Sequence, residues 1–183
     1  PLLTPDGSPS KWNVYTKYYL EDRLNDGIRP RDYLEDITND LGTAALKDLG
    51  LNDFFEFAKP PELVRRLMQW VGGRDGLYLD FFAGSGTTAQ AVLEQNAEDG
   101  GNRRFILVQL PEPCPRDSVA AQNGCRTIFD ICKERVRRVI ARLRDEREPH
   151  AALNLGYRVF RLDDGADGSA RRNGQQRTAC EVK

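Results

Sequence analysis

The sequence has few of the residues that build metal centres or disulfide frameworks. Its 183 residues include one histidine, His150, and four cysteines that form no C-x-x-C pair. This set does not supply the ligands of a structural zinc site. Cys125 and Cys132 lie on one face of a predicted helix, where we interpret them as small buried apolar residues. We therefore predict no metal site and, without a disulfide framework, a cytoplasmic location.

Long apolar runs and an excess of one charge are also absent. Hydrophobic residues make up 39% of the chain, charged residues 30%, and the formal net charge is −1. No apolar run approaches the roughly 20 residues that span a bilayer, so no membrane partner is predicted. A nearly neutral chain lacks the basic signature of a self-sufficient DNA-binding protein. Because the first residue is Pro1, we expect the chain to begin inside a longer protein.

The chain divides into three segments by pattern. Residues 1–50 are loop-rich, and only short helices are predicted there, around residues 33–37 and 44–49. Residues 51–163 carry regular hydrophobic patterns and form the predicted domain, which opens with a helix after Lys59-Pro60. Residues 164–183 are polar and aperiodic, so we predict a disordered tail.

The centre of this domain has a strand–helix–strand pattern. Leu77–Phe82 is a short apolar run typical of a buried strand, and Thr87–Asn96 has the spacing of a helix. Phe105–Leu110 is a second apolar run, and Tyr157–Leu162 a further candidate strand. Two strands joined by one helix form a parallel pair with a right-handed crossover. The sequence therefore predicts an α/β fold with a parallel sheet and flanking helices.

A long helix is predicted over residues 123–147. Ile128, Cys132, Val136, Val139, Ile140 and Leu143 form its apolar stripe. We assign its basic residues to the other faces, where acids are interleaved with them: Lys133, Arg135, Arg137, Arg138, Arg142, Arg144 and Arg147. Such a face is more typical of a solvated surface than of contacts to DNA phosphates.

The turn between the first strand and its helix carries the chemistry. Gly84 and Gly86 allow a sharp turn and a close approach of the backbone to a ligand. The next helix directs its first N–H groups at the same place, which suits a carboxylate, a phosphate or a purine ribose. The turn has no lysine, which excludes a phosphate-binding P-loop. With Ala89 and Glu112, the pattern fits sites for NAD and for S-adenosylmethionine alike.

The residues 80–88, Asp-Phe-Phe-Ala-Gly-Ser-Gly-Thr-Thr, resemble the cofactor motif of the permuted, β-class DNA amino-methyltransferases. Lys59-Pro60 resembles the lysine–proline motif of the same class. Residues 103–112, 134–136 and 156–163 are similar to segments of type III modification subunits. The resemblance covers about residues 35–163. It implies a partial, permuted, Rossmann-like S-adenosylmethionine-dependent methyltransferase fold.

The resemblance also implies roles for individual residues. The loop Phe82–Gly86 would pass under S-adenosylmethionine, Lys59 would neutralise its methionine carboxylate, and Glu112 would bind its ribose hydroxyls. Asp80 would approach the methionine amino group, and Thr87 and Thr88 would cap the helix. The predicted cofactor-binding residues are Lys59, Pro60, Asp80, Phe81, Phe82, Ala83, Gly84, Ser85, Gly86, Thr87, Thr88 and Glu112.

One departure from the family pattern concerns catalysis. The family transfers its methyl group at an Asp/Asn/Ser-Pro-Pro-aromatic tetrapeptide, whereas the only Pro-Pro pair here, Pro60-Pro61, stands between Lys59 and Glu62. We therefore predict no catalytic residue in this chain. We interpret it as a C-terminal fragment of an adenine-N6 DNA methyltransferase of a type III restriction-modification system.

The parent would bind double-stranded DNA, form a homodimer and associate with a restriction subunit. Three alternatives stay open at this point. The parent would be a cytosine-N4 methyltransferase of the same class, an NAD-dependent Rossmann oxidoreductase, or a non-catalytic assembly module.

Overall fold

The computed structural model describes residues 6–8, 19, 34–146, 155–162 and 177–181. The chain separates into two compact units, residues 1–34 and 35–183. In the first unit, the described part contains a turn in which Ser8 donates to Asp6. The second unit holds every helix and strand considered below.

The second unit contains four strands and five helices among its described residues. In chain order they are α2 (Asp40–Asp48), α3 (Pro61–Val71), β1 (Leu77–Asp80), α4 (Thr87–Asp99), β2 (Arg104–Gln109), α5 (Val119–Gln122), α6 (Ile128–Asp145), β3 (Arg158–Leu162) and β4 (Arg177–Glu181). Residues 34–39 are not helical, so the two short helices predicted before residue 50 are replaced by α2 alone. Tyr33 lies outside the described residues.

The sheet is mixed, with the strand order β1-β2-β4-β3. β1 and β2 are parallel, with Leu77 opposite Arg104 and Asp80 opposite Leu107. α4 joins them, which confirms the predicted strand–helix–strand unit. β4 is antiparallel to both β2 and β3. The predicted α/β class is therefore confirmed at this level, with a parallel pair inside a mixed sheet.

The position of β4 differs from the sequence prediction. Arg177–Glu181 belongs to the segment 164–183 that was expected to be disordered, yet it pairs along both of its edges. Ladder hydrogen bonds use backbone groups, so a polar sequence between two strands gains the same pairing as an apolar one. Residues 163–176 and 182–183 lie outside the described residues.

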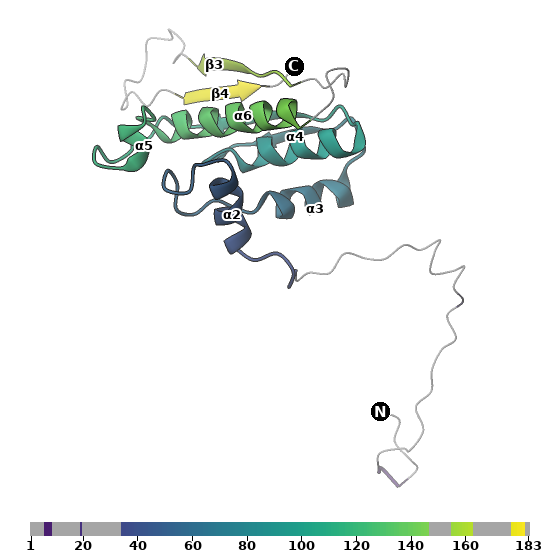
Figure 1. Ribbon diagram of the computed structural model, residues 1–183. Coiled ribbons are helices and arrows are strands. Elements are labelled where there is room, and N and C mark those ends of the chain that lie inside the picture. The colour runs from purple at the N-terminus through teal and green to yellow at the C-terminus, as the bar shows by residue number, and fades with distance from the viewer. Residues whose placement is uncertain (1–5, 9–18, 20–33, 147–154, 163–176, 182–183) are drawn as a thin grey trace, which may run out of the picture. The chain divides into compact units, whose positions relative to one another are not determined.

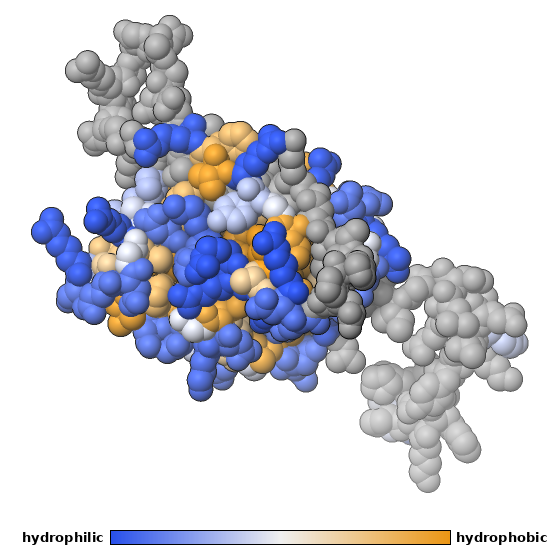
Figure 2. Space-filling model, turned by 45° about the horizontal axis from the view of Figure 1, so that its top comes forward, coloured by the Kyte–Doolittle hydropathy of each residue, from blue (hydrophilic) through white to orange (hydrophobic). Residues whose placement is uncertain are grey.

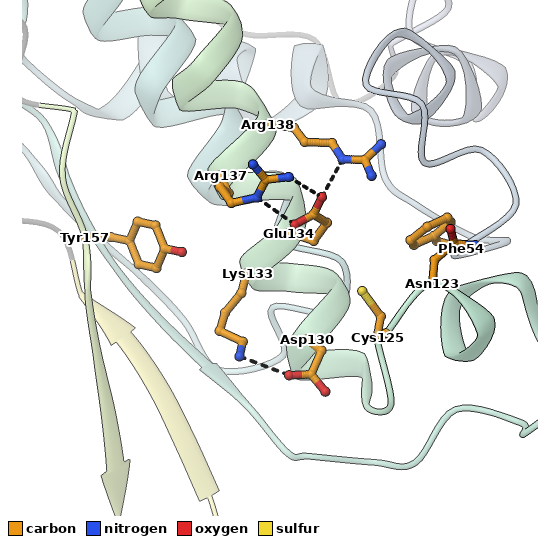
Figure 3. A pocket seen from close by; sticks show the side chains of 10 residues that line it. Phe54, Asn123, Cys125, Asp130, Lys133, Glu134, Arg137, Arg138 and Tyr157 are labelled. Carbon is orange, nitrogen blue, oxygen red and sulfur yellow. Dashed lines mark hydrogen bonds and ion pairs between the residues drawn. The ribbon is translucent and has the colours of Figure 1, made fainter.

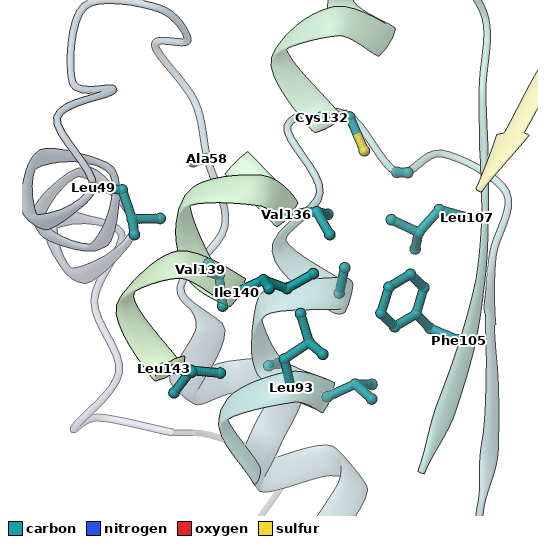
Figure 4. Close-up of a cluster of buried hydrophobic side chains, with 14 of the residues drawn as sticks. Leu49, Ala58, Leu93, Phe105, Leu107, Cys132, Val136, Val139, Ile140 and Leu143 are labelled. Carbon is teal, nitrogen blue, oxygen red and sulfur yellow. The ribbon is translucent and has the colours of Figure 1, made fainter. Parts of the chain in front are cut away.

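The core lies between one face of the sheet and the helices. α4 packs against both α3 and α6, and Figure 1 shows it between them. Its Val92 is fully buried, as are Phe105 of β2 and Val136 of α6. Figure 4 shows Phe105 and Leu107 pointing toward the side chains of α4 and α6. These contacts fix the end of β1 relative to the helix that follows it.

α6 begins later than the sequence predicted. Thr127 and Asp130 form a reciprocal capping box, in which the Thr127 hydroxyl accepts from Asp130 N at 3.2 Å and Asp130 Oδ2 accepts from Thr127 N at 3.0 Å. Before it, α5 ends at Gln122, and Gly124 has a φ of 88° that an ongoing helix does not allow. The predicted helix over 123–147 is therefore Ile128–Asp145, preceded by a separate turn.

Several apolar side chains remain exposed. Leu77, Leu79 and Phe81 alternate along β1 and its end, and each has about half or more of its surface accessible. On the face drawn in Figure 2, apolar areas are separated by hydrophilic residues. Within the described residues, none of the helices combines the length and the hydrophobicity needed to span a membrane.

Candidate functional site

Asp80 holds the start of the loop that follows β1. Its Oδ1 accepts from the backbone N–H of Phe82 at 3.0 Å, and its Oδ2 accepts from the Thr88 hydroxyl at 2.6 Å. The carboxylate thus joins the end of the strand to the first turn of α4. Each oxygen has a second lone pair, so these bonds leave acceptor capacity for a ligand.

The middle of the loop is held by β2. Gln109 Oε1 accepts from Gly84 N at 2.7 Å, and the carbonyl of Val108 accepts from Ala83 N at 3.2 Å. Gly84 and Gly86 have φ values of 52° and 87°, in the left-handed region that favours glycine. A Cβ at Gly86 would lie 3.0 Å from Cys132 Sγ, so a side chain there would also meet α6. Hydrogen bonds to β2 and close packing against α6 therefore set the conformation of the loop.

The inner side of the loop rests on Arg135 of α6. Nη1 of this guanidinium donates to Ser85 Oγ and to Thr87 Oγ1, each at 2.8 Å. Arg135 has no exposed surface, so its assignment to a solvated face was wrong. Arg135 is three residues after Cys132 and four before Val139, which places it on the apolar stripe of α6. This spacing is the signal in the sequence from which its burial could have been predicted.

Lys59 is joined to the loop through its backbone. The Thr87 hydroxyl donates to the Lys59 carbonyl at 3.2 Å, while Thr88 donates to Asp80. Neither threonine caps α4, whose N-cap is Gly86 without a side-chain hydrogen bond. The predicted capping role of Thr87 and Thr88 was therefore wrong. The helix start retains backbone donors for a ligand, and Lys59 lies beside it.

The predicted cofactor residues fall into three groups by burial. Those that support the loop from within are buried: Pro60, Ala83, Ser85, Gly86 and Thr87. Asp80, Gly84 and Thr88 are half-buried, while Lys59, Phe81, Phe82 and Glu112 are exposed. Phe82 is 91% exposed. The side chains of Lys59 and Glu112 form no ion pair or hydrogen bond with the described residues, which leaves both available to a ligand.

A cavity of about 350 Å³ lies elsewhere, beside the first turns of α6. Figure 3 shows its charged side chains turned toward one another. Glu134 accepts from Arg137 at 2.7 Å and from Arg138 at 2.6 Å, and these bonds lower the pKa of Glu134 to about 2. Lys133 pairs with Asp130 at 3.0 Å. Because these charges are already paired and none of the predicted cofactor residues line the cavity, we do not place the cofactor there.

A second cavity, of about 470 Å³, lies among α2, α3, α4 and α6. Its lining is acidic, and three of its acids are paired, Glu94 and Glu146 with Arg142 and Glu98 with Arg65. In the described part of the chain, no group of three or more His, Cys, Asp or Glu residues is arranged to hold a metal ion.

Comparison with protein families gives one match that covers more than half of the chain. The profile of the family described as DNA methylase matches residues 18–114. This range includes Lys59, the whole loop 80–88 and Glu112. The match therefore spans every residue predicted to bind the cofactor.

Curated relatives agree with this family. The chain is 38% identical over 125 residues to the Mod subunit of the type III restriction-modification enzyme StyLTI from Salmonella typhimurium, which covers 68% of this chain and 19% of that protein. It is 36% identical over 132 residues to the EcoPI Mod subunit of Escherichia phage P1, covering 72% of this chain and 20% of the relative. The type II methyltransferase M.KpnI from Klebsiella pneumoniae is 36% identical over 128 residues, which is 30% of its length. The chain thus spans about a fifth of the length of the type III relatives.

Proposed function

The chain belongs to the DNA methylase family, and we propose that it forms the S-adenosylmethionine-binding part of a site-specific DNA methyltransferase of a type III restriction-modification system, acting on adenine N6. The observation that carries the proposal is the conformation of the loop 80–88. Hydrogen bonds within the protein hold this loop, while its residues Phe81 and Phe82 are exposed to solvent. Similarity to two type III Mod subunits over about 70% of the chain supports the type of system.

The residues present fit an amino-acid-bearing nucleoside. The loop is fixed by Asp80, Gln109 and Arg135, so ligand binding does not have to order it. Beside the loop, the exposed Lys59 supplies a cation for a carboxylate. The exposed Glu112, which follows β2, supplies an acceptor for ribose hydroxyls. Phe82 presents an aromatic ring against which a purine can stack.

Each group then has a distinct task. Lys59 binds the carboxylate of the amino-acid moiety, and Glu112 orients the ribose. Asp80, with its remaining lone pairs, accepts from the ligand's amino group, and Gly84 and Gly86 permit close approach of the backbone. When bound, S-adenosylmethionine supplies a methyl group that an exocyclic amine attacks directly. The role of these residues is therefore to position the cofactor for this transfer.

The proposal extends to the domain and its partners. We propose a partial, permuted Rossmann-like fold, with β1, α4 and β2 as its cofactor-binding unit, and a cytoplasmic enzyme. Residues 1–50 would lead from a catalytic and target-recognition region. In the parent protein, the partners would be double-stranded DNA, a second copy and a restriction subunit.

Calorimetry on residues 1–183 tests the cofactor site. We expect S-adenosylhomocysteine to bind more tightly than NAD, because Lys59 offers a cation for the carboxylate. Glu112→Gln should weaken this binding by about 1.5–3 kcal/mol, the scale of hydrogen bonds to a charged group. Glu56→Gln, at another exposed position, serves as the matched control. Tighter binding of NAD would instead favour a nicotinamide-dependent oxidoreductase.

A further inference from the structure

Arg135 is a charged residue in the middle of an apolar core. None of its surface is accessible. Its hydrogen bonds go to neutral oxygens, namely Ser85 Oγ, Thr87 Oγ1 and, at 2.7 Å, Gln90 Oε1. Its Nη2 has no hydrogen-bond partner among the described residues. A guanidinium in such surroundings is usually paired with a carboxylate, because burial of an unpaired charge is costly.

The carboxylate linked to this guanidinium is engaged elsewhere. Gln90 connects Arg135 to Glu94, because Gln90 Nε2 donates to Glu94 Oε1 at 2.8 Å. Glu94 also forms an ion pair with Arg142, so it is shared with a second cation. Within the described residues, Arg135 itself makes no ion pair. The charge of Arg135 is therefore only partly compensated.

The charge persists at physiological pH. Burial lowers the pKa of Arg135 to about 10, which still leaves the guanidinium protonated at neutral pH. The cation stands directly behind Ser85 and Thr87, and Thr87 in turn donates to the carbonyl of Lys59. The buried cation, the glycine loop and the exposed lysine thus form one hydrogen-bonded unit.

We propose that Arg135 is a positioning residue of the cofactor site and that its buried charge makes the site prefer a ligand with a carboxylate over the same ligand with a neutral amide. This inference rests on the proposed cofactor function. The guanidinium acts through Ser85 and Thr87 and does not touch the ligand. The ligand's carboxylate supplies the negative charge that Arg135 lacks among its own neighbours.

The expected effect is measurable. At an effective dielectric constant of about 20, the attraction of the buried guanidinium for a carboxylate that it does not touch, reduced by partial solvation of the ligand, should change the affinity about 3- to 10-fold. A buried charge is screened by salt less than an exposed one. The part of the preference that comes from Arg135 should therefore persist at high salt, whereas the part from Lys59 should decline.

The test compares S-adenosylhomocysteine with its carboxamide, by calorimetry on the full chain. Wild-type protein should bind the acid more tightly. Arg135→Met should reduce the ratio of the two affinities about 3- to 10-fold. Arg137→Met is the matched control, since Arg137 lies on the same helix with 62% of its side chain exposed, and it should leave the ratio unchanged.

A second variant tests the contribution of Arg135 to the carboxylate preference even if circular dichroism shows that Arg135→Met does not fold. Lys59→Gln removes the exposed cation and should retain a preference for the acid, including at 0.5 M salt (roughly a 4 Å screening length). Complete loss of preference in Lys59→Gln would overturn the inference. So would an Arg135→Met protein that binds both ligands more weakly at an unchanged ratio, since that indicates a structural role alone. Binding of neither ligand by the wild type would overturn the proposed function itself.

Discussion

The side-chain oxygen of Gln109, at the end of β2, accepts a 2.7 Å hydrogen bond from the backbone N–H of Gly84. Gly84 lies in the loop after β1, and Gln109 ends β2, which runs parallel to β1 with Asp80 opposite Leu107. Gln109 therefore fixes the loop after β1 from the adjacent strand. Its amide also donates to the Leu110 carbonyl at 3.1 Å, which holds the side chain in the orientation that Gly84 requires.

Replacing Gln109 with leucine should loosen the loop more than it destabilises the domain. The Gly84 N–H would lose its acceptor, which costs about 1 kcal/mol of unfolding free energy. Binding of S-adenosylhomocysteine should weaken about 5-fold, because the ligand must then order the loop. Gln122→Leu, on the exposed surface of α5, is the control. An unchanged dissociation constant for Gln109→Leu would show that the loop keeps its form without this bond.

Gly86 should tolerate a side chain less well than other glycines with positive φ. Gly86→Ala places a Cβ 3.0 Å from Cys132 Sγ, whereas Gly124, with a similar φ of 88°, has nothing within 4 Å of the added atom. Gly124→Ala should therefore cost about 1–2 kcal/mol of strain. Gly86→Ala should cost about 1–3 kcal/mol more because of overpacking.

Urea unfolding of both glycine variants measures the difference. A Gly86→Ala, Cys132→Ala double variant tests its cause, because removal of Sγ should restore part of the stability. Equal unfolding free energies for Gly86→Ala and Gly124→Ala would contradict contact with Cys132 as the cause.

The ion pair of Asp99 with Arg103 should make stability depend on acid pH. Two guanidinium N–H groups of Arg103 donate to the two oxygens of Asp99, each at 2.9 Å, and these bonds lower the pKa of Asp99 from 3.8 to about 2. Because the folded pKa is the lower one, the stabilisation is complete above about pH 4 and is lost as the pH falls through about 2.

Asp99→Asn should remove this dependence and cost about 2–4 kcal/mol, since it leaves the buried Arg103 without its anion. Unfolding free energies measured between pH 2 and pH 7 check both statements. The exposed Asp75→Asn variant is the control. Parallel pH profiles for the wild type and Asp99→Asn would assign the acid sensitivity to another group.

Cofactor binding and methyl transfer should be separable in this chain. Residues 1–183 contain no Asp/Asn/Ser-Pro-Pro-aromatic tetrapeptide, and base flipping costs a few kcal/mol that a stacking pocket must offset. We therefore expect S-adenosylhomocysteine to bind but no labelled methyl to reach duplex DNA. Incorporation of label by this chain alone would require a target-base site outside the loop, and digestion to nucleosides would identify adenine N6 or cytosine N4 as the acceptor.

The sequence by itself determined the local pattern of the cofactor unit. The apolar run at residues 77–82, the glycines at 84 and 86 and the helical spacing after Thr87 each reflect interactions between near neighbours. Such patterns follow directly from the periods of strands and helices and from the φ values that only glycine adopts easily. The structure confirms the strand, the turn and the helix at these positions, with β1 ending at Asp80. That the loop binds a cofactor stays a prediction.

Only the tertiary structure decided which polar side chains support that loop. Arg135 is separated from Ser85 by 50 residues and Gln109 from Gly84 by 25, so no local period relates them. In sequence, Arg135 is one of several arginines on α6, and its spacing places it on the apolar stripe, but only the packing of α6 against α4 shows which groups it contacts. β4 was likewise missed, because its pairing with β2 and β3 uses backbone groups that every residue carries. Contacts between distant segments are set by how the elements pack, and composition and periodicity report only on the elements themselves.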